Sequence, residues 1–116
     1  MDNLIRVYDD VIDKDSCNTL IGKFETHEEQ HETVYQEDGD EKIAFKQLQM
    51  IKFKEWESVQ SGMLELFQDY IVRYKIDCNI KTKQWPDEYG YEAIRMKRYL
   101  NNDSDRFDPH VDVLNH

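Results

Sequence analysis

Apolar residues recur with helical spacing along one long stretch of the chain, and this stretch limits the folds available to the rest. Across Trp56–Tyr74 the large side chains keep a 3.6-residue period for about five turns of helix. A shorter apolar stripe of the same period lies within Cys17–Phe24, just after the N-cap candidates Asp13 and Asp15. The sequence therefore predicts two amphipathic helices, the first ending near residue 29.

Period-two alternation marks the expected strands. It is present in Leu4–Tyr8 and in Tyr91–Leu100, and a further strand is expected to begin at Pro109. Ile43–Phe53 fits either a strand or a helix, and we favour an extended segment. The acidic stretch 31–42 carries a glycine between two aspartates and is expected to be an exposed loop. This order of elements predicts an α+β domain in which two main helices pack on an antiparallel sheet.

Charge and length narrow the class of protein. The chain has 116 residues, enough for one small domain, and we find no boundary within 1–116. With 25 acidic against 15 basic residues, its net charge of −10 opposes binding to nucleic acid or to an anionic membrane surface. No run of residues has the length of a membrane-spanning helix, and the first ten residues lack the pattern of a secretory signal. We therefore expect a cytoplasmic protein.

A histidine and an aspartate lie one residue apart in the stretch DRFDPHVDV. Residues i and i+2 of a strand point to the same side, so His110 and Asp112 would face one way. An imidazole and a carboxylate presented together can supply two ligands to one metal ion. The pattern H-x-D alone is common by chance, and its meaning depends on the residues around it.

The stretch YEAIRMKRYLNNDSDRFDPHVDV resembles the prolyl 4-hydroxylase-like group of Fe(II)- and 2-oxoglutarate-dependent dioxygenases. In that family a strand bearing a tyrosine is followed by a polar loop, an aromatic residue and the H-x-D pair, often with a proline before the histidine. Here these elements are Tyr99, the loop 101–106, Phe107, Pro109 and His110. The opening strand, the helix with a cysteine near its start and the long helix are also similar to the family.

The resemblance implies a fold and a set of roles. The fold is a double-stranded β-helix, or jelly roll. His110 and Asp112 would be the first two ligands of Fe(II), and Tyr99 would hydrogen-bond the distal carboxylate of 2-oxoglutarate. The reaction would be hydroxylation of a C–H bond, with a peptidyl proline as one candidate substrate. The loop after Tyr99 is about two residues longer than the family pattern.

The family pattern also requires a second histidine and a basic residue that come several strands after the H-x-D pair. His116 is the one later histidine in the sequence, and along a straight strand it would lie about 20 Å from His110 at ~3.3 Å per residue. We therefore expect residues 1–116 to be the N-terminal portion of a longer oxygenase domain. On its own this portion should be inactive and should bind metal and 2-oxoglutarate poorly.

Arg95, Lys97 and Arg98 form the one basic cluster that the sequence suggests. By alternation Arg95 and Lys97 share a face with Tyr99, so they could help to hold an anion. The alternative is that these cations pair with some of the 25 acidic residues, and we favour that alternative.

A second hypothesis is that the chain is a complete, non-catalytic interaction module with an acidic surface. With either hypothesis the last strands would have an uncovered edge. Pairing or exchange of strands between two copies would cover that edge. We therefore expect a homo-oligomer that forms through the C-terminal strands.

Overall fold

The computed structural model describes residues 4–37 and 41–109, and its first helix begins at a predicted cap. Helix α1 spans Lys14–Thr26, and the Asp13 carboxylate accepts a hydrogen bond from the backbone N–H of Ser16 at 2.7 Å. This bond satisfies one of the amides that a first helical turn leaves without an internal partner. The helix ends before the expected boundary, and a 3-10 turn at Glu28–Gln30 follows.

The long helix is confirmed. Helix α2 spans Glu57–Asp77, and a 3-10 turn at Lys54–Trp56 leads into it. Its C-terminal end is a left-handed cap, because Asn79 has a φ of 50° and the N–H of Ile80 donates to the Lys75 carbonyl at 2.9 Å. Within the described residues, no helix combines the length and the apolar character that crossing a membrane requires.

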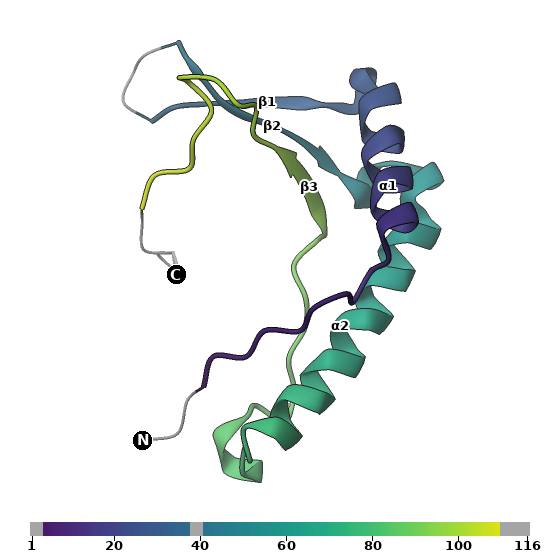
Figure 1. Cartoon of the computed structure of the whole chain (residues 1–116), viewed down its shortest axis with the longest axis vertical. Coiled ribbons are helices and arrows are strands. Elements are labelled where there is room, and N and C mark those ends of the chain that lie inside the picture. The colour runs from purple at the N-terminus through teal and green to yellow at the C-terminus, as the bar shows by residue number, and fades with distance from the viewer. Residues whose placement is uncertain (1–3, 38–40, 110–116) are drawn as a thin grey trace.

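Three strands form one antiparallel sheet. Strands β1 (Glu32–Tyr35), β2 (Ile43–Gln49) and β3 (Arg95–Arg98) lie in the order β1-β2-β3, so β2 is central. The expectation of an α+β fold with two helices and an antiparallel sheet is confirmed. In Figure 1 both helices lie on one side of β3, and the chain that returns after β3 lies on the other.

Three details of the predicted elements are wrong. The stretch 31–42 is not wholly a loop, because its β-forming residues Thr33, Val34 and Tyr35 pair with β2. The strand expected over Tyr91–Leu100 forms only at Arg95–Arg98. On the other side of Arg95 the central strand gives way to the 3-10 turn Met50–Lys52, and a single backbone bond from Met50 N–H to the Ile94 carbonyl follows the ladder.

The third wrong detail is the N-terminal strand. Residues 4–8 are extended but belong to no strand of the described sheet. They run beside the C-terminal half of α2, far from the three strands (Figure 1). Side-chain hydrogen bonds hold them there: Tyr8 donates to the Asp77 carboxylate at 2.7 Å, and Tyr74 donates to the Leu4 carbonyl at 2.6 Å.

The two faces of the sheet differ in what covers them. One face carries Leu48 and Met96, which are directly opposite each other on β2 and β3, and it packs against the helices. The core on this side is formed by Phe24, Leu48, Met50 and Trp56, all at most 4% exposed.

We call the other face of the sheet the open face. Its members follow from the antiparallel register, because directly opposed residues point to the same side. They are Glu32, Val34, Phe45, Gln47, Gln49, Arg95 and Lys97.

The chain exposes much surface for its mass. Its accessible area is 9619 Å², whereas a compact monomer of 14.0 kDa exposes about 6,700 Å². Its radius of gyration is 17.2 Å, against about 13 Å for a compact domain of this length. Large apolar side chains such as Ile5, Val7 and Ile76 are more than 70% exposed. The described elements therefore leave apolar surface that another part of a protein could cover.

We predict that Leu48→Ala lowers the free energy of unfolding by about 2–5 kcal/mol, because Leu48 is 0% exposed at the centre of the core. Ile51→Ala is the control: Ile51 is 65% exposed, and its truncation should cost less than about 0.5 kcal/mol. Urea unfolding followed by far-UV circular dichroism measures both values. Equal losses for the two variants would contradict this core.

Candidate functional site

The two expected metal ligands, His110 and Asp112, lie outside the described residues. The described chain ends at Pro109, the residue that directly precedes His110. Of the expected site residues, the structure therefore places Tyr99 and the segment that leads up to the H-x-D pair. Among the described residues no three His, Cys, Asp or Glu side chains gather as metal ligands would, and this search did not include His110 or Asp112.

The polar loop after Tyr99 turns the chain back along β2. Asn102 Oδ1 accepts hydrogen bonds from the backbone N–H groups of Ser104 and Asp105 at 2.8 and 2.7 Å, and the Asp105 carboxylate accepts one from Leu100 N–H at 2.8 Å. Asn and Asp commonly form turns in this way. The N–H of Arg106 then donates to the Ala44 carbonyl at 2.9 Å. The segment 106–109 is thereby held beside the central strand.

Two aromatic rings, one before this turn and one after it, pack on Phe45, which is only 5% exposed. The Tyr99 ring centroid lies 4.9 Å from that of Phe45, and the Phe107 centroid lies 6.1 Å from it. The Lys97 ammonium lies over two of these three rings, 4.7 Å from the Phe45 centroid and 5.0 Å from that of Phe107. We call Phe45, Lys97, Tyr99 and Phe107 the aromatic cluster.

Partial burial raises the pKa of the Tyr99 phenol above its usual value of 10.0. The hydroxyl is therefore protonated at neutral pH and can donate a hydrogen bond to an anion. Tyr99 remains 42% exposed, so a ligand can reach it. Its position on the open face agrees with the alternation that placed it beside Lys97.

The basic cluster of β3 divides into paired and unpaired cations. Arg98 binds the Glu25 carboxylate at 2.8 Å on the helix side, and Arg95 lies 3.4 Å from the Glu92 carboxylate. For these two arginines the expected pairing with acidic residues is confirmed. Lys97 differs, because no carboxylate of the described residues lies within ion-pair distance of its ammonium.

At the other end of the open face, side-chain hydrogen bonds form a network around Glu32. Glu32 accepts hydrogen bonds from Gln47 at 3.0 Å, from Gln49 at 2.9 Å and from the Lys52 ammonium at 2.9 Å. Hydrogen bonds from Gln47, Lys52 and Gln49 lower the pKa of Glu32 from 4.5 to about 2. Its negative charge is thus fully compensated within the network. Gln47 is 8% exposed, whereas the side chains of Glu32 and Lys52 are 37% and 54% exposed, so the network connects a buried amide of the sheet to the surface.

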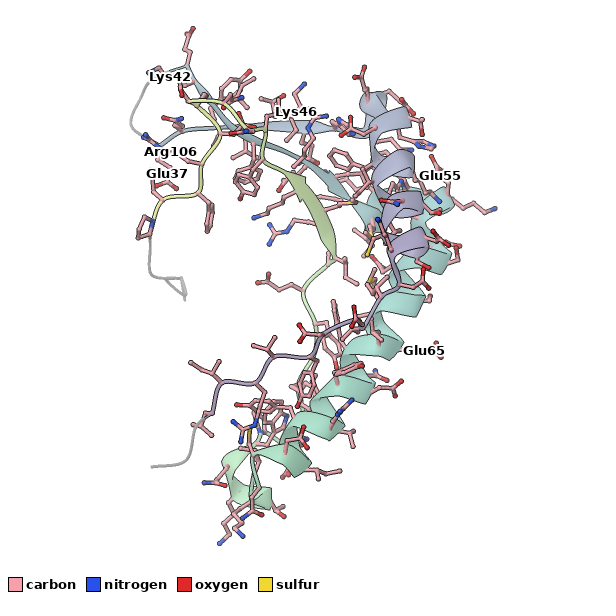
Figure 2. All side chains as sticks on the ribbon, viewed as in Figure 1. Glu37, Lys42, Lys46, Glu55, Glu65 and Arg106 are labelled. Atoms are coloured by element: carbon pink, nitrogen blue, oxygen red, sulfur yellow. The ribbon has the colours of Figure 1, made fainter. Side chains whose placement is uncertain are left out.

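A cavity of about 400 Å³ borders the aromatic cluster at the end of the sheet away from the helices. Val34, Phe45, Phe107 and Pro109 give it apolar walls, and Glu37 and Arg106 also line it. Figure 2 shows Glu37 and Arg106 near each other at this end, whereas Glu55 lies at the helix end. Pro109, the last described residue before the H-x-D pair in the sequence, is among the residues that line this cavity.

Sequence reasoning expected Tyr99 on the same face as Lys97, but it missed the residues that surround Tyr99. Phe45 lay in the ambiguous segment Ile43–Phe53, where the pattern did not decide which side chains share a face. The alternation of Phe45, Gln47 and Gln49 was the signal that could have found the open face. The contact of Lys97 with Phe107 depends on the turn in between, which no periodicity reveals.

Comparisons with known proteins identify no relative of this chain. No family model, no curated protein and no solved structure matches it.

We predict that Glu32 makes the stability of the protein depend on pH between about 4.5 and 2. A carboxyl group whose pKa is lower in the folded state stabilises the fold above its unfolded-state pKa, and this contribution is lost as the pH falls through the folded-state value. Glu32→Gln should therefore be less stable than the wild type at pH 7, and the difference should shrink as the pH is lowered toward 2.

Urea unfolding of both proteins at a series of pH values measures this difference. Glu65→Gln is the control, because Glu65 is an exposed residue on the outer side of α2 (Figure 2) and should give no such trend. A difference between wild type and Glu32→Gln that stays constant from pH 7 to about 3 would contradict the role of the network.

Proposed function

We propose that this chain is part of an Fe(II)- and 2-oxoglutarate-dependent dioxygenase of the prolyl 4-hydroxylase-like kind. The observation that carries the proposal is the contact of the Tyr99 ring with Phe45 of the open face, just before the turn that precedes the H-x-D pair in the sequence. The resemblance of residues 91–113 to that family supplies the roles. In this proposal β1, β2 and β3 are early strands of a jelly roll, and the open face is turned to its inside.

The residues of this chain would have separate tasks. His110 and Asp112 would hold the metal through an imidazole nitrogen and a carboxylate oxygen, the donors typical of non-haem iron sites. The neutral Tyr99 hydroxyl would donate a hydrogen bond to a carboxylate of 2-oxoglutarate. The apolar walls given by Phe45 and Phe107 would exclude water around the reacting groups. Bound iron would supply the activation of O₂, with one oxygen atom going to succinate and one to the hydroxylated C–H bond as CO₂ is released.

The proposal requires ligands beyond residues 1–116. An iron site of this class needs a second histidine, and the co-substrate needs a basic partner from a later strand. The area of uncovered surface is consistent with this requirement, because further strands would bury it. The hydroxylated substrate is proposed as a peptide, by family analogy alone.

Activity of the protein encoded by the complete reading frame tests the proposal. With Fe(II), 2-oxoglutarate and O₂ it should form succinate, and His110→Ala or Asp112→Ala should lower the rate by about 100-fold or more, because each removes a metal ligand. Asp103→Asn is the matched control, since Asp103 is exposed in the polar loop and should leave the rate unchanged. Succinate formation that survives both ligand substitutions would contradict the site, and absence of any succinate formation would contradict the reaction.

A second candidate function is a non-catalytic module that acts through self-association. The excess of accessible surface over that of a compact monomer favours it. Such a module would fold cooperatively and have a defined oligomeric state, whereas an isolated part of an enzyme would be unstable or would associate without a fixed stoichiometry.

We predict that the 116-residue chain self-associates in either case, because among the described residues β1 and β3 are edge strands with no further strand paired to them. Sedimentation velocity at about 10–100 µM should show a concentration-dependent dimer or larger species. A well-folded monomer throughout this range would contradict the prediction.

A further inference from the structure

We propose that the groove between α1 and the N-terminal half of α2 is a docking site for a cationic amphipathic helix of a partner protein. We call this feature the interhelical groove. None of the residues that line it belongs to the open face of the sheet, so the inference does not depend on the proposed function.

The interhelical groove is apolar. It consists of two cavities of about 410 and 470 Å³, which adjoin because Ile12 and Leu66 line both of them. In Figure 1 α1 lies beside the N-terminal half of α2, and side chains of both helices form the walls. Those side chains include Leu20, Val59, Met63 and Phe67. A groove between two helices can receive the apolar face of a third helix.

The packing of α2 indicates that an element is missing on this side. Helix α2 has 21 residues and an apolar stripe of about five turns, yet none of its residues is fully buried. A stripe of this kind normally faces a core. Val59, Met63 and Leu66 remain only partly buried, so the described part of the chain leaves room for a further helix against them.

Gly62 forms part of the groove wall, in the interior of α2. A glycine at such a position weakens a helix, so a packing reason for it is expected. Within the described chain there is none, because a Cβ atom at Gly62 would meet no other atom within 4 Å. The missing side chain instead leaves space where the backbone of a docked helix can approach α2 closely.

The rim of the groove is acidic. By helical spacing Glu65 follows Gly62 by one turn and Asp69 follows Glu65 by another, so both lie along the edge of α2 beside the groove. Asp15 lies one turn before Thr19, which lines the groove on α1. All three carboxylates are exposed, and no lysine or arginine of the described residues forms an ion pair with them.

Two cations adjoin the groove, but both have contacts within the fold. Lys23 donates to the Glu55 carbonyl and lies 4.9 Å from the ring centroid of Trp56. Arg73 lies 5.0 Å from the ring centroid of Tyr8. Positive charge beside the rim carboxylates would therefore come from the partner. A second copy of this chain carries the same rim and a net charge of −10, so repulsion disfavours it as the occupant.

Fluorescence anisotropy with a labelled peptide tests the site. The probe is a synthetic peptide of about 18 residues with leucine at i, i+3, i+4 and i+7 and lysine elsewhere, which forms a cationic amphipathic helix. It should bind the 116-residue chain saturably. A peptide of the same composition in scrambled order should bind about tenfold more weakly, and a leucine–glutamate helix more weakly still, because the rim repels it.

Gly62→Leu should fill the groove and weaken binding of the leucine–lysine helix roughly tenfold. The variant should stay folded, because its new side chain begins in open space and leucine is the better helix former. Gly22→Leu is the matched control. Gly22 lies within α1, a Cβ atom there also meets nothing within 4 Å, and Gly22 lines neither cavity. This control should leave the affinity unchanged.

A second pair of variants tests the rim. Glu65→Gln combined with Asp69→Asn should weaken binding of the leucine–lysine helix about fivefold, because it removes charge beside the groove. Asp87→Asn combined with Glu88→Gln removes the same charge from exposed positions after α2 and should have a smaller effect.

Three results would overturn the proposal: absence of saturable binding, equal binding of the ordered and scrambled peptides, or equal effects of a variant and its control. Two others would overturn it by identifying a different occupant. Loss of a dimer in sedimentation of Gly62→Leu would assign the groove to a second copy. Binding by the 116-residue chain but not by the protein encoded by the complete reading frame would assign it to later residues of the same polypeptide.

Discussion

The buried side chain of Trp56 connects the two helices to the central strand, and the rest of the fold depends on this contact. Trp56 is 0% exposed, and its indole N–H donates to the side-chain oxygen of Gln30 at 2.9 Å. Gln30 is itself 6% exposed and also donates to the Glu55 carboxylate, so the polar groups in this dry region are satisfied. Because Gln30 follows α1 and Trp56 precedes α2, this contact fixes both helices against Leu48 of β2.

As a consequence, the two helices cover only one face of the sheet. Packing of both helices on the Leu48 side leaves the open face to its own side chains: the Glu32 network at one end and the aromatic cluster at the other. These groups cover Phe45 and Gln47, which are only 5% and 8% exposed.

The accessible area of the whole chain is roughly 2,900 Å² above that of a compact monomer, and the exposed side chains of Ile5, Val7 and Ile76, on the N-terminal segment and α2, contribute to this excess. An interface between subunits or a set of further strands would bury part of such an area.

Periodicity of apolar residues correctly predicted the long helix. It did not predict which segments are strands, because a strand forms only where a neighbouring strand is available for pairing. The five-turn pattern of Trp56–Tyr74 specified α2 without help from its surroundings. Leu4–Tyr8 alternates as a strand should, but alternation does not provide a neighbour, and the segment is held on α2 by Tyr8 and Tyr74 instead. The few β-forming residues of β1 were hidden among acidic ones, and pairing with β2 made them a strand.

In the candidate site, too, alternation predicted which side chains share a face but not the contacts that depend on a turn. Alternation placed Tyr99, Lys97 and Arg95 on one face, and the register confirms that Lys97 and Arg95 share it. The contact of Phe107 with Phe45 could not be predicted, because it depends on the Asn102 turn and on one hydrogen bond between Arg106 and Ala44. The roles of His110 and Asp112 rest on the resemblance, and they stay predictions.

In the proposed function the open face is the inside of an oxygenase barrel, and His110 is the first residue of its metal site. The most direct measurement is the coding sequence that follows the codon for His116. If the proposal is correct, the reading frame continues through further alternating strands and supplies a histidine and then a lysine or arginine. A frame that continues without this pair, or a stop codon directly after His116, would contradict it.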